Sequence, residues 1–571
     1  MKGNPSMKFK DFQYTRPDIT GVRDKFEALL EKFSSAKSAD EQDSILTEIN
    51  TLRNNFDTME EIISINYTID TTNEQMEKEH DYFDDIRPVF AGLINKYYHT
   101  LLKSPYKEEL RSKRGDHLFD LAEIGIKTYS PEILPDLKEE NQLSSRYVKL
   151  MASAKIDFDG EERNLAGLSP YMSSPDREVR RKASEAYWKF FVDNEEELDE
   201  IYDKLVKVRD RIAKKLGYKN FIELGYARMR RTEYGPEQVA DFRSHVLNYL
   251  VPLSTKLKEK QLKRLGLDEL RHYDYGIRFK SGNPTPKGDP EWIVSNARDM
   301  YKDLSPDTDE FMSHMVDVGL MDLYNKKGKA PGGYCAYIPD YKSPFIFANM
   351  NGTSDDIRVL THEAGHAFQG YCSRNFESPE YYHPTLEACE IHSMSMEYIT
   401  WPWMKLFFKE DTEKFKVSHL EKSAQFIPYG VCVDHFQHYI YENPEATPAE
   451  RKTKWRELEK QYMPYKDYPE NDFLQRGGYW QGQGHIYRSP FYYIDYCLAE
   501  ICAFQFWVKS LENKDKAWED YLRLCQAGGS MSFLKLVELA DIDSPFNEET
   551  VKTVVDKVEQ WLDNVDESKL Q

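Results

Sequence analysis

Hydrophobic residues recur at intervals of three and four along most of this chain, and charged residues fill the positions between them. On a helix this spacing forms one apolar stripe, so it predicts amphipathic α-helices whose charged faces contact solvent. The pattern therefore indicates a large, mainly α-helical protein. Its clearest helical segments are residues 18–33, 39–63, 74–102, 132–153, 176–192 and 195–216.

A few short stretches have β-strand character instead. Residues 155–164 carry Asp159-Gly160 between β-prone flanks, which predicts a hairpin with a two-residue turn. Residues 334–338 and 345–350 are two further β-prone runs, and Pro339-Asp340 between them predicts a second hairpin with a longer loop. The chain should therefore contain a small sheet within a mostly helical fold.

The pentapeptide His362-Glu363-Ala364-Gly365-His366 follows the second hairpin. Residues four apart on a helix project from one face, about 40° apart around the axis, so both imidazoles can reach one metal ion. Two histidines at this spacing with a glutamate after the first form the H-E-x-x-H motif, in which the glutamate is the general base of a zinc protease. The motif predicts that His362 and His366 bind zinc and that Glu363 activates water.

The flanking sequence favours a helix around this motif. Asn351-Gly352 is a turn signal, and Thr353 with Asp356 three residues later fits a capping box. Apolar residues then recur at helical spacing on the side opposite the histidines, and Gly370 offers a stop. We expect the apolar side of this helix to pack in a core while the histidines face a cleft.

A catalytic zinc site usually has three protein ligands and one position for water. Residues 385–398 are a helix-like run with three candidate carboxylates, Glu387, Glu390 and Glu397. Glu390 and Glu397 share a face and Glu387 is displaced from it, but spacing alone does not choose among them. His392 is a weaker candidate that fits a packing role better.

The motif and its surroundings resemble the thimet oligopeptidase family, and more narrowly oligoendopeptidase F and the Pz-peptidases. The resemblance rests on the H-E-x-x-H motif, on Glu390 with Ser393 and Glu397 after it, and on residues 332–335, 344–347, 351–353 and 485–487. It implies that Glu390 is the third ligand of one Zn²⁺ per chain. It also implies that Glu397 orients a ligand, a role that the hydrogen-bond partners of metal-binding histidines usually have.

The strands before the metal-binding helix offer a place for substrate. An exposed strand edge beside the zinc could receive an extended peptide by strand addition, and pairing through the main chain would tolerate many side chains. The predicted pairing residues are Phe345, Ile346, Phe347 and Ala348.

Residues 476–487 hold four glycines within eight positions, which predicts a flexible loop, and a helix should open near Tyr493. Peptide hydrolysis needs hydrogen-bond donors for the oxyanion that develops on the scissile carbonyl, and histidine and tyrosine can supply them. In the family that this chain resembles, a histidine and a downstream tyrosine pair have this role. They correspond to His485, Tyr493 and Tyr496, although the alternative of Tyr492 stays open.

A second group of polar residues lies between the motif and this loop. His435 and His438 are three apart, and Glu442 follows His438 by four, so a helix could gather them. Helix packing explains this group better than a second metal site does, and His438 could line the substrate channel.

Composition narrows the possible partners and compartment. The chain has 571 residues, 77 lysines and arginines against 98 aspartates and glutamates, and a net charge of −21, which disfavours nucleic acids and anionic membranes. No stretch is apolar and long enough to span a membrane, and no signal peptide is evident. Seven cysteines without a C-x-x-C pair suit a reducing cytoplasm. Residues 1–6 precede a second methionine, Met7, and are a candidate for an added segment.

These features predict a cytoplasmic zinc endopeptidase that cleaves short unstructured oligopeptides, as a monomer or weak homo-oligomer. We expect an N-terminal helical region over residues 1–171 and a catalytic region over 172–571, and the resemblance implies a zincin fold whose two halves enclose a deep channel. One alternative is a zinc carboxypeptidase of related fold, with Arg488 as the clamp for a terminal carboxylate. Another is a zinc-containing peptide-binding protein without turnover, although Glu363 would then have no purpose.

Overall fold

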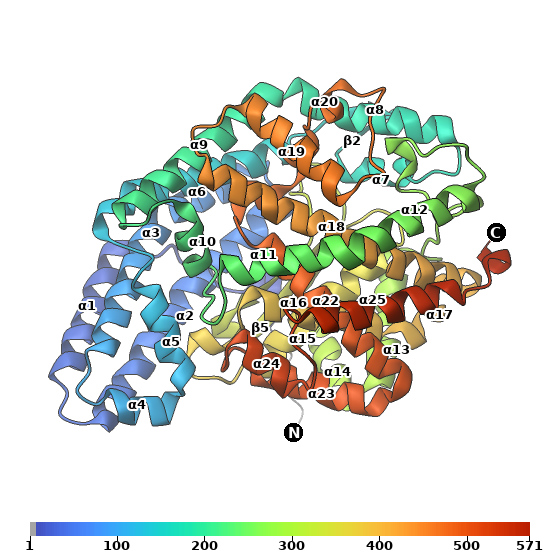
Figure 1. Cartoon of the computed structure of the whole chain (residues 1–571). Coiled ribbons are helices and arrows are strands. Elements are labelled where there is room, and N and C mark those ends of the chain that lie inside the picture. Colours follow the sequence, from blue (N-terminus) through green and yellow to red (C-terminus); the bar gives the residue numbers. More distant parts are fainter. Residues whose placement is uncertain (1–6, 571) are drawn as a thin grey trace.

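The computed structural model of the protein describes residues 7–570. Helices form most of the described chain, and two small β-sheets accompany them (Figure 1). This confirms the mainly helical fold that the hydrophobic spacing predicts. Residues 1–6, the candidate added segment, lie outside the described residues.

A bundle of helices forms the N-terminal end of the molecule (blue in Figure 1). Its three long helices begin where the side chains of Asp18, Ser38 and Asn73 accept hydrogen bonds from backbone N–H groups of the first turn. The bundle has its own core, in which the rings of Phe56 and Phe90 stack with centroids 3.8 Å apart. Its helices are α1 (Ile19–Ser35), α2 (Ala39–Ile69), α3 (Glu74–Leu102), α4 (Lys107–Arg114) and α5 (Asp116–Gly125).

A run of helices interrupted by one hairpin follows the bundle. The predicted hairpin is confirmed, with β1 (Ile156–Phe158) antiparallel to β2 (Glu161–Arg163). Asp159 and Gly160 between them have φ values of 55° and 77°, the positive values that a two-residue hairpin turn requires. The helices are α6 (Leu134–Ala152), α7 (Ser169–Met172), α8 (Arg177–Asp193), α9 (Glu195–Lys215), α10 (Phe221–Arg228), α11 (Pro236–His245), α12 (Val251–Leu265), α13 (Pro290–Leu304) and α14 (Pro306–Val318).

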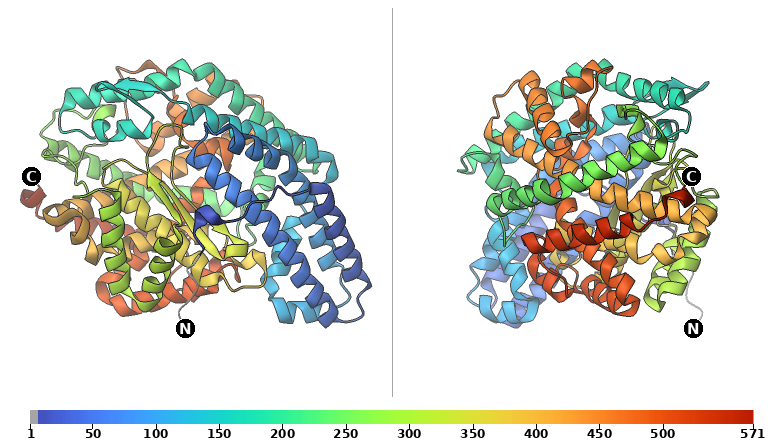
Figure 2. Two further views of the ribbon diagram at one scale, coloured as in Figure 1. Left: turned by 180° about the vertical axis from the view of Figure 1, so that it is seen from behind. Right: turned by 45° about the vertical axis from the view of Figure 1, so that its right-hand side comes forward.

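The second sheet has three strands, β3 (Met321–Tyr324), β4 (Tyr334–Ile338) and β5 (Ser343–Met350), in the order β3-β5-β4. The predicted second hairpin is confirmed, because β4 and β5 pair antiparallel. β3 pairs parallel with the other side of β5, so β5 is the central strand and β4 is an edge. Seen from behind, this sheet lies between the N-terminal bundle and the helices of the C-terminal half (Figure 2).

The C-terminal half is helical again. α16 packs between α15 and α22 at the centre of this half, and α18 and α25 also contact α22. The helices are α15 (Asp355–Ser373), α16 (Leu386–Ile399), α17 (Lys405–Phe408), α18 (Thr412–Glu442), α19 (Pro448–Tyr462), α20 (Asp472–Gln475), α21 (Gly484–Arg488), α22 (Tyr493–Glu512), α23 (Lys514–Ala527), α24 (Phe533–Leu539) and α25 (Glu548–Asp563).

The ends of α15 differ from the prediction. Asp356 accepts hydrogen bonds from the backbone N–H groups of Asn351 and Gly352, at 3.0 and 2.8 Å, while the Thr353 hydroxyl donates to Asn351 Oδ1. The predicted capping box is therefore wrong, since Asp356 closes the preceding turn. Gly370 does not stop the helix, which continues by three residues.

The glycine-rich segment is also more regular than predicted. A 3-10 turn, Tyr479–Gly482, and helix α21 occupy most of it. At Gly477, where φ is 98°, a Cβ atom would overlap the backbone carbonyl of Lys452. Gly477 is therefore required by the close approach of two backbone segments and by its positive φ. The prediction of a flexible loop was wrong, because most of this segment is helical.

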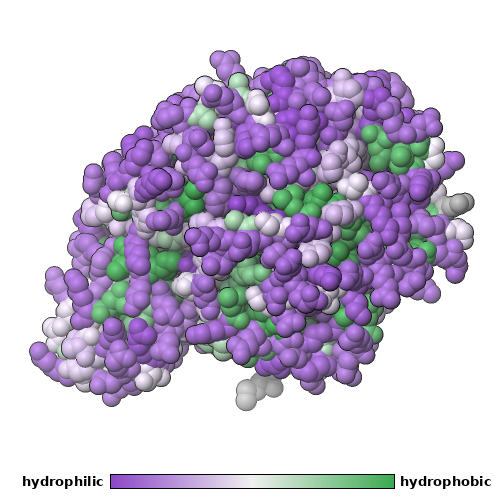
Figure 3. Space-filling view, in the orientation of Figure 1, coloured by the Kyte–Doolittle hydropathy of each residue, from purple (hydrophilic) through white to green (hydrophobic). Residues whose placement is uncertain are grey.

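The surface of the molecule is mostly hydrophilic on the face shown in Figure 3, where hydrophobic residues form small separate patches. Within residues 7–570, no helix combines the length and the apolar character needed to cross a membrane. The division of the chain near residue 171 stays a prediction.

Candidate metal centre

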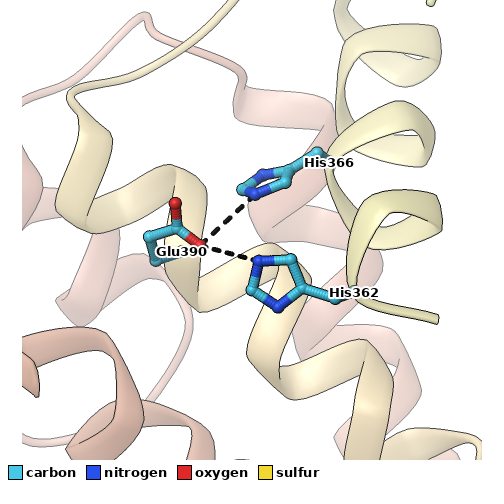
Figure 4. A group of neighbouring side chains, drawn as sticks. All are labelled: His362, His366 and Glu390. Atoms are coloured by element: carbon cyan, nitrogen blue, oxygen red, sulfur yellow. Dashed lines mark ion pairs between the residues drawn. The ribbon is translucent and has the colours of Figure 1, made fainter. Parts of the chain in front are cut away.

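Two histidines and one glutamate converge at the centre of the C-terminal half (Figure 4). Nε2 of His362 and Nε2 of His366, both on α15, lie 3.2 and 3.3 Å from the same oxygen, Oε2 of Glu390 on α16. The opposite side of α15 is buried, as the apolar stripe predicts, and includes Ile357 and Leu360. The packing of that side in the core turns the two imidazoles toward α16.

Gly365, between the two histidines, allows α15 and α16 to approach closely. A Cβ atom at this position would lie 2.5 Å from the carbonyl oxygen of His392 and 2.6 Å from Cα of Ser393. Both are backbone atoms of α16, so a side chain could be accommodated only by moving a helix. The absence of a side chain at Gly365 thus brings Glu390 within reach of both histidines.

The three side chains fit a zinc ion. Their ligand atoms all lie within 4.8 Å of one another. Donors about 2.0–2.1 Å from a tetrahedral metal lie roughly 3.3–3.4 Å apart, close to the two N–O distances given above. Two imidazoles and one carboxylate are also a ligand set of catalytic zinc sites. Among the carboxylates that the sequence leaves open, the geometry therefore favours Glu390.

Glu397 lies about two turns beyond Glu390 on the same helix, α16, and contacts the side of the His362 ring that faces away from Glu390. Its two oxygens lie 2.7 Å from Nδ1 of His362 and 2.7 Å from Nε2 of His419 on α18. The indole N–H of Trp401 donates to Nδ1 of His419 at 2.8 Å. Because an indole can only donate, His419 must carry its proton on Nε2 and donate it to Glu397.

This chain of contacts also determines the tautomer of His362. Its Nδ1–H donates to Glu397, which leaves the lone pair of Nε2 free for a metal. Burial alone would raise the pKa of Glu397, but hydrogen bonds from His362 and His419 and the charge of Arg358 lower it to about 2. Glu397 is therefore a carboxylate at neutral pH and accepts from both rings.

Glu390 has two further partners. The Ser393 hydroxyl donates to Oε2 at 2.8 Å, and the Tyr492 hydroxyl donates to Oε1. Burial would raise the pKa of Glu390, yet the nearby His366 and His362 hold it well below its usual range. The carboxylate is thus charged and oriented by its neighbours.

Glu363 is buried beside these residues, and its Oε2 has no hydrogen-bond partner among residues 7–570. Burial raises the pKa of this carboxyl. Its other oxygen faces Gly333 at the start of β4, where an added Cβ atom would lie 3.4 Å away. A side chain at Gly333 would fill the space between Glu363 and the strand edge.

His485 on α21 lies on the other side of the cleft. The Tyr429 hydroxyl donates to Oε1 of Gln483 at 2.7 Å, which orients the Gln483 amide so that its N–H donates to Nδ1 of His485 at 2.8 Å. The proton of His485 then resides on Nε2, which lies 3.1 Å from the Tyr496 hydroxyl. Burial and the charge of Arg488 lower the pKa of His485 to about 4, so the ring is neutral at neutral pH.

One cavity of about 430 Å³ joins most of these groups. His362, Glu363 and Glu397 line it together with His485, Tyr493 and Tyr496, and Gly333 borders it. Tyr492 stacks beside Tyr496, with ring centroids 5.0 Å apart, and contacts Glu390. The structure thus brings the sequence-predicted histidines, glutamates and tyrosines into one site.

Strand β5 does not belong to this cavity. Phe345, Ile346, Phe347 and Ala348 are buried, and the first three lie opposite residues of β4 on one side. Ile346 and Phe347 also pair with β3 on the other side, so their backbone has no free edge. The prediction that a peptide adds to this strand is wrong, because a short strand, β3, makes β5 central. The edge strands of this sheet are β3 and β4, and Gly333, the residue before β4, borders the cavity.

Other predicted candidates take packing roles. His392 is fully buried on α16 against the ring of Tyr521 and is not one of the three grouped ligand residues. His438 bonds to the Tyr226 hydroxyl at 3.0 Å, and Asp434 pairs with Arg243 at 2.6 Å. Within residues 7–570, the other group spaced for a metal is His80, Asp81 and Asp84 on α3, which is partly exposed.

Sequence reasoning missed the residues that support the site from outside. His419 and Trp401 orient Glu397, and Tyr429 and Gln483 orient His485. None of these four residues belongs to a motif. His419, Trp401 and Tyr429 lie on other segments than the residues they orient, and the sequence around Gln483 does not predict the direction of its side chain. Apart from Gln483, which is two residues before His485, only the fold brings these residues next to the groups that they orient.

Comparison with known proteins agrees with this geometry. The family model for the "Peptidase M3 N-terminal domain" matches residues 9–129, and the model for "Peptidase family M3" matches residues 170–555. The chain belongs to peptidase family M3. The described fold also superposes on the solved structure "PZ PEPTIDASE A with inhibitor 2" with a TM-score of 0.98 and 57% identity, covering 98% of this chain and 100% of that one.

Two further relatives are less similar in sequence and match over different lengths. An "Oligoendopeptidase F homolog" of Borreliella burgdorferi is 23% identical over 534 residues, which are 86% of each chain. "Group B oligopeptidase PepB" of Streptococcus agalactiae is 24% identical over 400 residues, 67% of this chain and 63% of that protein. Membership of family M3 makes the chain a metallopeptidase, and the resemblance read from its motifs is confirmed.

Proposed function

We propose that this member of family M3 is a zinc-dependent endopeptidase that hydrolyses short, unstructured oligopeptides. The observation that carries the proposal is the convergence of His362 and His366 on one oxygen of Glu390, with the unpaired carboxylate of Glu363 beside them. Zinc, when bound, polarises the scissile carbonyl and lowers the pKa of its water toward ~7.

Glu363 is the proposed general base. It takes a proton from the attacking water and later delivers it to the leaving amine. Burial raises the pKa of this carboxyl, which makes its conjugate base a better proton acceptor than an exposed glutamate. A carboxylate without a protein partner is also free to bond to water and then to the amine.

His485 and Tyr496 are the proposed pair that stabilises the developing oxyanion, with Tyr496 as the donor and His485 as the group that positions its hydroxyl. The network through Gln483 supports this role, because it keeps the His485 proton on Nε2. If that proton is donated to the Tyr496 oxygen, the Tyr496 hydroxyl hydrogen is free to point into the cavity. Tyr493 lines the same cavity and is proposed to position substrate, while Tyr492 contacts Glu390 and is less free to turn to substrate.

We propose that substrate pairs with the edge of β4 at its Gly333 end. Gly333 borders both the cavity and Glu363, so an extended peptide along this edge would carry a carbonyl past the metal ligands. Pairing through the backbone would leave many side chains acceptable. A proline scan of the substrate tests this, because each proline removes one N–H, and equal cleavage of every scanned peptide would exclude strand pairing.

The proposed limit to short peptides rests on the depth of the site. All three ligands are at most partly exposed, and Glu390 is 1% exposed. A folded domain would have to unfold before it reached them, at a cost of about 5–15 kcal/mol. We infer a channel between the N-terminal bundle and the catalytic half. Cleavage of unfolded casein at the rate of a ten-residue peptide would exclude such a channel.

The base assignment is tested by Glu363→Gln. This variant should bind zinc as the wild type does, because all three ligands remain, and should lose most of its turnover. Zinc content by atomic emission and hydrolysis of a quenched peptide are measured on the same samples. Loss of zinc, or near-normal hydrolysis, would contradict the role of Glu363.

Two broader proposals concern the setting of the enzyme. The cysteine pattern and the net charge of −21 suit a cytoplasmic enzyme, and fractionation of cells that express the tagged chain would test this. We also propose a monomer or weak homo-oligomer. Light scattering that gave a stable assembly at nanomolar concentration would contradict it.

A further inference from the structure

Two basic side chains border the cavity beside the metal centre. Arg358 lies one turn before His362 on the same face of α15, and both residues line the cavity of about 430 Å³. Lys422 on α18 lines the same cavity. Asp355, at the start of α15, is a further lining residue. The cavity wall beyond His362 therefore holds two cations and one anion.

One carboxylate oxygen of Asp355 is shared between the two cations. Oδ1 of Asp355 lies 3.3 Å from Nε of Arg358 and 3.1 Å from Nζ of Lys422. Within residues 7–570, these are the side-chain hydrogen bonds and ion pairs that Arg358 and Lys422 form. The guanidinium of Arg358 is thus bound through Nε alone, and its two terminal nitrogens have no partner among these residues. Because two cations share one anion, a net positive charge remains on this wall.

The other acidic groups that line the cavity do not neutralise this charge. Both oxygens of Glu397 are occupied, by His362 and His419, at 2.7 Å each. Burial and then the charge of Glu397 raise the pKa of Glu500 to about 8, so this carboxyl is mostly neutral at pH 7. Glu363 is the proposed base beside the metal. None of these carboxyls pairs with the two basic side chains.

Strand β4 runs alongside α15 in the same direction. A Cβ atom at Gly333, just before β4, would lie 3.2 Å from a side-chain atom of Val359. A Cβ atom at Gly370, three turns further along α15, would lie 3.5 Å from the ring of Tyr337, near the other end of β4. Since Val359 follows Arg358 in the sequence, a peptide paired with this edge approaches Arg358 at its Gly333 end.

We propose that Arg358 and Lys422 form a subsite that binds a carboxylate of the peptide substrate beyond the Gly333 end of β4. This inference rests on the proposed endopeptidase function. The terminal nitrogens of a guanidinium form a planar fork that matches a carboxylate, and a lysine adds a point charge. The side chains of Arg358 and Lys422 are 37% and 29% exposed, so a ligand in the cavity can reach both.

The charge of Lys422 is compatible with this role. Burial lowers the pKa of Lys422, and the charge of Asp355 opposes this shift. A substrate carboxylate would favour the charged ammonium in the same way, because an opposite charge nearby raises the pKa of an amine. Binding of a carboxylate would therefore strengthen the positive charge of the subsite.

The carboxylate can be the C-terminus of the peptide or an acidic side chain, and the test separates the two. One parent peptide with an internal cleavage site has both ends blocked and no acidic residue. A second version has a free C-terminus. Further versions carry glutamate, or glutamine as its neutral match, at each of the three positions on either side of the cut. For each peptide kcat/KM is measured with zinc-loaded enzyme, and mass spectrometry confirms that the same bond is cleaved.

Four variants accompany the wild type. Arg358→Gln and Lys422→Gln each remove one positive charge, and Arg358→Lys keeps the charge but not the fork. Arg374→Gln is the matched control, because Arg374 follows the C-terminal end of α15, lies 3.5 Å from Glu310 and does not line the cavity. Zinc content and Tm are measured for each variant, so that damage to the metal centre or the fold is recognised.

The wild type should cleave one carboxylate peptide faster than its neutral match, by on the order of tenfold. This lies between the small effect of an exposed ion pair and the larger effect of a buried hydrogen bond to a charged group. Arg358→Gln should lose most of this ratio, Lys422→Gln should lose part of it, and Arg374→Gln should retain it. Arg358→Lys should keep more of the ratio than Arg358→Gln does. The version that shows the effect identifies the C-terminus or the acidic position.

The ratio separates substrate binding from a structural role. The charge of Arg358 also helps to lower the pKa of Glu397. If this were its only role, Arg358→Gln would lower zinc content or slow the neutral and charged peptides alike, and the ratio would not change. Should Arg358→Gln fail to fold, the wild-type ratios and Lys422→Gln still decide.

Several results would overturn the inference. They are a wild type that cleaves all versions alike or prefers the neutral ones, an unchanged ratio in Arg358→Gln or Lys422→Gln, and a ratio lost in Arg374→Gln. Failure of the endopeptidase proposal is recognised separately, because zinc-loaded wild type would then cleave no version, including the neutral end-blocked one.

Discussion

Replacement of Glu397 by glutamine should weaken zinc binding without touching a ligand. The amide has one oxygen and one NH2 group where the carboxylate has two acceptor oxygens. His419 must donate from Nε2, because Trp401 donates to its Nδ1. The amide oxygen therefore turns to His419, and the NH2 group faces Nδ1 of His362. His362 can then accept this bond only by moving its proton to Nε2, the atom that faces Glu390 and the metal.

The size of the effect follows from the contacts that are lost. Two 2.7 Å hydrogen bonds meet at a carboxylate that is 5% exposed, and one of them must break or reverse. A hydrogen bond to a charged group contributes about 1.5–3 kcal/mol, which corresponds to a loss of roughly 10- to 150-fold in zinc affinity. Competition with a chromophoric chelator at pH 7.5 measures this directly.

The matched control and the rescue variant make this prediction specific. Glu500 is another buried glutamate nearby, whose pKa burial raises to about 8, so Glu500→Gln replaces a group that is mostly neutral at pH 7 and should leave zinc affinity within about twofold. Adding Trp401→Phe to Glu397→Gln frees His419 to change tautomer, and should recover part of the affinity. An affinity of Glu397→Gln within threefold of wild type, or no recovery in the double variant, would refute this reasoning.

Three further changes test other parts of the site and fold. Tyr496→Phe should lower kcat by on the order of 10² to 10³ with a modest change in KM, as for loss of an oxyanion donor, and steady-state kinetics showing less than a threefold effect would move the role to Tyr492 or Tyr493. Gly365→Ala places a Cβ atom 2.5 Å from the carbonyl oxygen of His392, so it should destabilise the fold by about 1–3 kcal/mol and reduce zinc content, and a wild-type Tm with full zinc would contradict the tight helix contact. Burial lowers the pKa of His438 to about 4, below the value of about 6.5 in an unfolded chain, so its contribution to stability is complete above pH 6.5 and is lost as the pH falls toward 4. His438→Gln should therefore cost up to about 3 kcal/mol more at pH 7 than at pH 4.5, and urea melts showing an equal cost at both would exclude this linkage.

The long helices were predictable because their apolar stripes face a core that local periodicity describes. Residues 74–102 were expected as a helix, and α3 has the same bounds. The turn at Asp159-Gly160 was predictable because few sequences accept two consecutive positive φ values. Helix caps and helix ends were harder to predict than the helices themselves. Asp356 accepts hydrogen bonds from backbone groups of the preceding turn, and this pairing depends on how the chain passes from β5 into α15.

The site was predictable only where one helix supplies several groups. His362, Glu363 and His366 share α15, so their spacing fixes their relation. The choice among glutamates on α16 depends on the rotation and depth of that helix against α15, which the contact at Gly365 sets. The central place of β5 follows from its pairing with β3, a strand of four residues that the hydrophobic pattern does not mark.

Hydrolysis of an end-blocked peptide with an internal cleavage site tests the central claim most directly. Enzyme stripped of metal, enzyme reloaded with one equivalent of Zn²⁺, and reloaded Glu363→Gln are incubated with the same peptide, and the products are identified by mass spectrometry. We predict two fragments from a single internal cut by the reloaded wild type and almost none from the other two samples. Stepwise loss of residues from an unblocked end only, or equal cleavage by the stripped enzyme, would contradict a zinc endopeptidase.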